Sequence, residues 1–91
     1  MYGMDAGELS NRSNELDKIA RPLADEMYAA IDEKAPAPVR QDLIKRAKAC
    51  IASHDEFLAM LQGVQREEVE SEHKRNMDDI RQFLIQLEEL K

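Results

Sequence analysis

Apolar residues recur at helical spacing in three successive stretches of the chain. The last stretch carries a narrow stripe of Val69, Met77, Ile80, Phe83, Leu84, Leu87 and Leu90, and almost all residues between them are charged or amide. This spacing predicts an amphipathic helix, whose apolar face must be buried against a partner in the same chain or in another. The stretch therefore indicates packing or binding and not a reaction centre.

The first stretch opens with a helix start signal. Asp5 is suited to cap the helix, and Glu8 stands where a capping box places its acid. Apolar residues then follow at helical spacing: Leu9, Leu16, Ile19, Ala20, Leu23, Met27, Ala30 and Ile31. Pro22 lies inside this pattern and lacks a backbone donor, so we expect a bend near residue 21. The pattern predicts a helix over about 6–33.

The second stretch follows a clear linker, Ala35-Pro36-Ala37-Pro38. Each proline disfavours helix at the residue before it, and Pro38 suits the first position of a new helix. The apolar residues of this stretch are Val39, Leu43, Ile44, Ala47, Cys50, Ile51, Phe57, Leu58, Leu61 and Val64. They predict a helix over about 38–62.

The apolar stripe slips out of phase near Gly63 and resumes at Val69. A left-handed Gly63 with Val64 packing back would end the second helix there. The alternative is one helix of about 50 residues that runs through Gly63 at a cost near 1 kcal/mol. We favour a single domain over 1–91, an all-α antiparallel three-helix bundle with its third helix over about 65–90. The rival is a helical hairpin with an extended third helix that packs in a dimer.

Composition limits the classes of function. A chain of 91 residues suffices for one small domain, and 43% apolar with 35% charged residues is not a disordered composition. The net charge is −6 and no basic stripe is present, so we expect no nucleic-acid binding. No apolar run approaches a membrane span and no signal-peptide pattern opens the chain, so we expect a cytoplasmic or nuclear protein without membrane contact.

The residues that could carry chemistry do not form complete sites. Glu70 and His73 have the spacing of a di-iron ligand pair, but such a site needs a second pair and two further glutamates. Cys50 and His54 lie one turn apart, whereas structural zinc takes four ligands, and Cys50 fits the apolar phase as a core residue. The Ser-His-Asp triplet at 53–55 points in different directions on a helix. We therefore expect no catalytic residue, no metal and no cofactor. We also expect that the protein is not an enzyme.

The third stretch resembles the last helix of BAG domains, through the pattern Val69-x-x-x-His73-Lys74-x-x-Met77-x-x-Ile80-Arg81-x-Phe83-Leu84-x-x-Leu87-Glu88. The segment from Leu58 to Val64 resembles the end of the second helix in that family. The passage from the first to the second helix of BAG domains is similar to the segment with Pro22-Leu23, Tyr28 and Ile31 and to the proline linker that follows it. The resemblance covers most of the chain.

The resemblance implies a three-helix bundle that binds the ATPase domain of an Hsp70 chaperone and promotes nucleotide release. Polar contacts in BAG domains come from the second and third helices, which implies a partner-binding surface here around Gln62, His73, Lys74 and Arg81. Lys74 matches the basic residue that BAG domains carry at this position. The other three replace the family's aspartate, arginine and glutamine, and Ala52 stands near its glutamate.

These observations lead to two hypotheses about function. The first is a non-enzymatic interaction module that acts as an Hsp70 co-chaperone or adaptor. The second is a dimerisation or scaffold module of a larger complex, unrelated to Hsp70, in which the third helix pairs with another copy in a homodimer.

Overall fold

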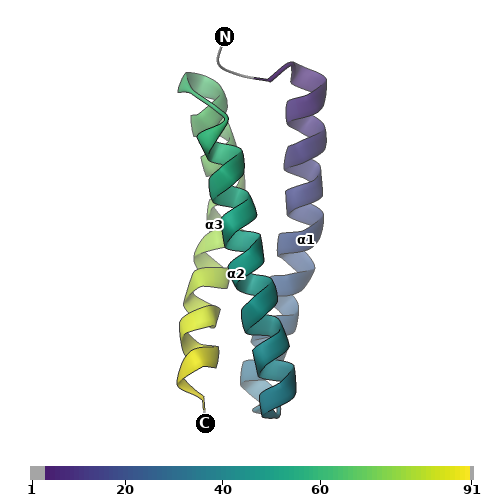
Figure 1. The fold of residues 1–91 in the computed structure, drawn as a ribbon, viewed down its shortest axis with the longest axis vertical. Coiled ribbons are helices and arrows are strands. Elements are labelled where there is room, and N and C mark those ends of the chain that lie inside the picture. The colour runs from purple at the N-terminus through teal and green to yellow at the C-terminus, as the bar shows by residue number, and fades with distance from the viewer. Residues whose placement is uncertain (1–3, 91) are drawn as a thin grey trace.

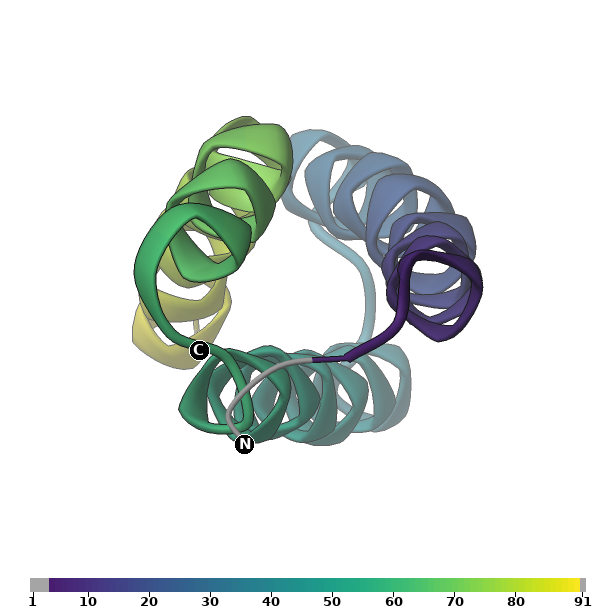
Figure 2. The ribbon, with the colours of Figure 1, turned by 90° about the horizontal axis from the view of Figure 1, so that it is seen from above.

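The computed structural model describes residues 4–90, which form the helices α1 (Ala6–Glu33), α2 (Ala37–Ala59) and α3 (Gly63–Glu89). The helices lie side by side with alternating direction (Figure 1). Seen along the long axis, they occupy the corners of a triangle (Figure 2). Each helix packs against both others. The predicted all-α three-helix bundle is confirmed, and the rival hairpin with a projecting third helix is not adopted.

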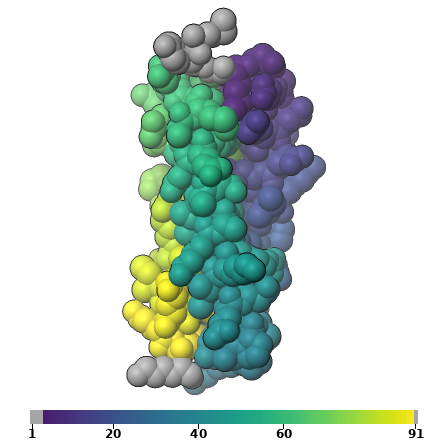
Figure 3. All heavy atoms as spheres, in the orientation of Figure 1, coloured from purple at the N-terminus to yellow at the C-terminus, as the bar shows by residue number. Residues whose placement is uncertain are grey.

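The bundle is a rod of 47 × 18 × 18 Å. Its length is set by single helices, because the 28 residues of α1 span about 42 Å at the α-helical rise. In a space-filling view α2 lies in front and is flanked by the side chains of α1 and α3 (Figure 3). The α2–α3 connection lies at the end where α1 begins, and the α1–α2 connection lies at the other end (Figure 1).

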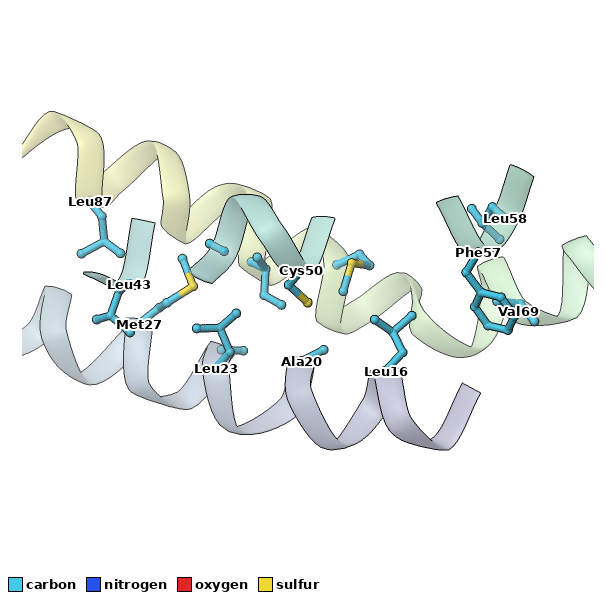
Figure 4. Close-up of a cluster of buried hydrophobic side chains, with 14 of the residues drawn as sticks. Leu16, Ala20, Leu23, Met27, Leu43, Cys50, Phe57, Leu58, Val69 and Leu87 are labelled. Carbon is cyan, nitrogen blue, oxygen red and sulfur yellow. The ribbon is translucent and has the colours of Figure 1, made fainter. Parts of the chain in front are cut away.

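The core is built from apolar side chains of all three helices and runs the length of the rod. Met27, Leu43 and Leu87, one from each helix, converge near one end (Figure 4). The other buried apolar residues are Leu16, Ala20, Leu23, Ala24, Ala30, Ala47, Cys50, Phe57, Leu58, Leu61, Val69, Met77 and Ile80. Ile19 was predicted on this face, but it is 58% exposed because it lies one residue off the line of Leu16, Ala20 and Leu23.

The first helix has well-defined ends. The Glu8 N–H donates to the Asp5 carboxylate at 2.9 Å, which forms the predicted cap. The helix continues through Pro22. At its C-terminus Lys34 adopts a left-handed conformation with φ of 53°. The N–H groups of Lys34 and Ala35 donate to the carbonyls of residues 31 and 30, which is a Schellman motif.

The connection between α2 and α3 differs in detail from the prediction. The second helix ends at Ala59 and not at 62, because the next two N–H groups form tighter bonds to carbonyls three residues back and Leu61 turns into the core. Gly63 has φ of 60°, in the left-handed region, but it opens α3 at 63 and not at 65. Val64 does not pack back, since it is 68% exposed.

We predict that Ile80→Ala lowers the free energy of unfolding by about 2–5 kcal/mol, because it opens a cavity at a fully buried site. The matched control is Ile85→Ala on the same helix. Ile85 is 59% exposed, so its loss should change stability by less than about 0.5 kcal/mol. Urea unfolding followed by circular dichroism measures both, and equal losses would contradict the packing described here.

We predict opposite effects of one substitution at two glycines. Gly63→Ala should destabilise the protein by about 1–2 kcal/mol, because an L side chain is strained at φ of 60° even with open space around it. Gly7→Ala should stabilise it by about 0.5–1 kcal/mol, because residue 7 is helical and its added Cβ makes only an ordinary contact with Asp5. Thermal unfolding of both variants checks the signs, and a stabilised residue-63 variant would refute this assignment.

Candidate functional site

A groove of 580 Å³ separates the outer edges of α2 and α3. We call it the α2–α3 groove, and it is lined by His54, Asp55, Leu58, Glu67, Glu70, Ser71, Lys74, Met77, Asp78 and Arg81. The apolar Leu58 and Met77 are buried at 8% and 2% exposure, whereas the charged lining residues are exposed. The groove therefore has an apolar floor and a charged rim of both signs.

Two of the four predicted partner-binding residues, Lys74 and Arg81, lie on this rim, two turns apart on α3. The Lys74 ammonium donates to Asp78 at 2.8 Å, and this hydrogen bond raises the pKa of Lys74 above its ordinary value. The Arg81 guanidinium reaches Asp55 of α2 at 3.4 Å. Both ion pairs are solvent-exposed, and such pairs contribute little to stability. The two cations are thus free to exchange their present partners for others.

The other two predicted residues lie elsewhere. Gln62 is exposed at the start of α3, outside the residues that line the groove. His73 was expected on the polar face, but it is 0% exposed and lies inside the bundle. The physical reason is its helical phase: Val69 and Met77, four residues before and after it, are both buried. The predicted set therefore does not form a single surface, and His73 does not contribute to the exposed face of α3.

Three polar side chains, one from each helix, meet in the core. Ser13 is 4% exposed, His54 is 6% exposed, and His73 is fully buried. We call these three residues the histidine layer. Ser13 Oγ and His73 Nε2 share a hydrogen bond of 2.8 Å, and the two imidazole rings meet edge to face at 6.3 Å between centroids.

Sequence reasoning missed this layer although its signal was present. His54 falls in the apolar phase between Cys50 and Phe57, and His73 falls in phase between Val69 and Met77. Both histidines were weighed as polar groups for metal or partner contacts. Their periodicity instead placed them with the core, as it did Ser13 between Leu9 and Leu16.

Burial governs the protonation of His73. The pKa of His73 lies below its ordinary value because burial disfavours the charged imidazolium, and His54 nearby adds to this effect. Glu72 and Asp17 act in the opposite direction but do not overcome burial. The neutral imidazole is therefore the stable form of His73 in the folded protein near neutral pH.

The chemical groups of the core are enclosed. Ser13 and His73 are hydrogen-bonded as a nucleophile and its base would be. Neither residue lines the α2–α3 groove, so the pair does not face that groove. Cys50 is 4% exposed, and burial raises the pKa of its thiol. Within residues 4–90, no cluster of three or more His, Cys, Asp or Glu side chains is arranged to hold a metal ion.

Ion pairs also join the helices outside the groove. Arg46 of α2 donates to both carboxylate oxygens of Glu26 in α1, at 3.1 and 2.6 Å, and this contact lowers the pKa of Glu26. Lys48 of α2 lies 3.7 Å from Glu88 of α3. These exposed ion pairs connect α2 to both neighbouring helices.

No protein-family model matches the chain, and no curated protein or solved structure shows significant similarity to it. Over residues 4–90, the helices are too polar or too short in their apolar runs to cross a membrane.

We predict that Ser13→Ala lowers the free energy of unfolding by about 1–3 kcal/mol, because it removes the hydrogen-bond partner of a buried imidazole nitrogen. The control is Ser10→Ala, at an exposed position of the same helix, which has the same helix propensity gain. Chemical unfolding at pH 7.5 measures the difference between them. Equal stabilities of the two variants would show that the buried hydrogen bond contributes nothing.

Proposed function

We propose that this protein is a non-enzymatic helical interaction module that binds the ATPase domain of an Hsp70 chaperone through the α2–α3 groove. The observation that carries the proposal is the position of Lys74 and Arg81 on one rim, beside a floor of Leu58 and Met77. In BAG domains the chaperone contacts come from the second and third helices, and this groove is formed by α2 and α3.

The electrostatics of the rim support this proposal. Lys74 and Arg81 are the cations that line the groove, and each is paired with a carboxylate of the same chain across an exposed contact. A carboxylate on the partner can replace Asp78 or Asp55 at small cost, because exposed ion pairs are weak. Charges arranged in this way mainly set specificity and the rate of association, while the apolar floor adds buried area.

The buried His73 defines how binding would differ from that of a typical BAG domain. His73 aligns with the family arginine, but its side chain is enclosed in the core and cannot make the contact that this arginine makes. Lys74, the next residue, is exposed and would provide the basic contact on this part of α3. Ala52 offers no carboxylate near the family glutamate position. With fewer charged contacts, we expect micromolar rather than nanomolar affinity.

We predict that the wild-type protein releases heat on titration into an Hsp70 ATPase domain at about 50 µM and accelerates the release of bound ADP. The double variant Lys74→Glu/Arg81→Glu should bind about tenfold more weakly or not at all, because both rim cations are reversed. Isothermal titration calorimetry and a fluorescent ADP release assay measure the two effects.

The matched control is Arg12→Glu/Lys18→Glu, which makes the same change in charge at exposed positions of α1. It should bind like the wild type. Absence of wild-type binding at this concentration would refute the chaperone partner. An equal loss in both double variants would refute the groove as the contact surface.

A further inference from the structure

The histidine layer leaves most of its ring nitrogens without a partner. Among residues 4–90, both ring nitrogens of His54 and Nδ1 of His73 have no hydrogen bond. The one bond in the layer joins Ser13 to Nε2 of His73. The Nδ1 of His54 lies 3.5 Å from the Asp55 carboxylate, but that contact lacks hydrogen-bond geometry. A buried polar atom without a hydrogen bond is costly, and the cost rises when its group carries a charge. The stability of such a core therefore depends on the charge of these groups.

A proton added to His73 would leave one of its two N–H donors without an acceptor. A neutral imidazole has one N–H donor, whereas the imidazolium has two. Ser13 Oγ can accept one of these donors at Nε2. The other, at Nδ1, would point into a layer that has apolar neighbours one turn away on each helix: Leu9, Leu16, Cys50, Phe57, Val69 and Met77.

The charged groups that face the layer from each helix do not compensate for this burial. On α1, Asp17 is already engaged by Arg21 at 3.2 Å and by the Asn76 amide at 3.2 Å. On α2, Asp55 is held by Arg81 of α3, and His54 is a second titratable ring beside the first. On α3, Glu72 attracts the proton from an exposed position, and its effect on the pKa of His73 is smaller than the effect of burial.

We propose that the histidine layer is an acid-sensitive switch, which lets the three helices close on one another only while the His73 imidazole is neutral. Protonation of His73 would place a charge with an unpaired N–H donor between α1, α2 and α3 and open the bundle. His54 also lines the α2–α3 groove, so opening would change the shape of that surface. The switch does not depend on which partner the groove binds.

The sign of the pH dependence follows from proton binding in the two states. The unfolded chain protonates His73 near the ordinary value of 6.5, whereas the folded chain does so only at lower pH. Below about pH 6.5 the unfolded state therefore binds more protons, and stability falls as the pH decreases. Above that pH the full stability is present.

We predict that the melting temperature of the wild type falls by more than about 4 °C between pH 7.5 and pH 5.0. The chain has only two histidines, and most carboxylates titrate below this window. The variant His54→Leu/His73→Leu should show a nearly flat profile over the same range, because it has no imidazole to protonate. Ser13→Ala keeps both rings and should keep the pH dependence at a lower overall stability.

A second measurement keeps the test decisive if the leucine variant does not fold. Nuclear magnetic resonance of the wild-type imidazoles should show that His73 protonates only below its ordinary pKa of 6.5, with protonation accompanied by loss of the native signals. A flat wild-type profile would overturn the proposal. Titration of His73 near pH 6.5 while the bundle stays folded would also overturn it.

Discussion

Burial of the apolar stripe of α3 against α1 and α2 is the interaction on which the rest of the molecule depends. Val69, Ile80 and Leu87 are at most 2% exposed, and each closes a different level of the core. A 91-residue chain has little apolar surface to spare, so a two-helix hairpin without this stripe would be marginal. The same packing turns the charged side of α3 outward beside α2 and thereby creates the α2–α3 groove.

The histidine layer makes that packing conditional. Most of the core is aliphatic and insensitive to pH, but one level contains two imidazoles and a hydroxyl with a single hydrogen bond among them. Apolar residues at both histidine positions would satisfy the helical phase without any unpaired ring nitrogen. The layer therefore lowers the stability that the fold could otherwise reach, and it links that stability to the protonation of His73.

Much of the fold could be predicted from the spacing of apolar residues, because that spacing determines which face of each helix is buried. The cap at Asp5 and the left-handed Gly63 followed from local chemistry. The end of α2 did not, because it depends on Leu61 turning into a core built by other helices. The site was predicted less well. His73 was assigned by its polarity, whereas its exposure is decided by Val69 and Met77, and a partner's identity lies in surface residues and not in the fold.

The central claim, that α3 closes the bundle within its own chain, is tested most directly by small-angle X-ray scattering with the molecular mass determined on the same dilute sample at pH 7.5. A closed monomer predicts the mass of one 10.4 kDa chain and a radius of gyration near the 14.4 Å of its Cα atoms, with a small increase for side chains and hydration. A dimer mass, or a particle much longer than 47 Å, would contradict the account.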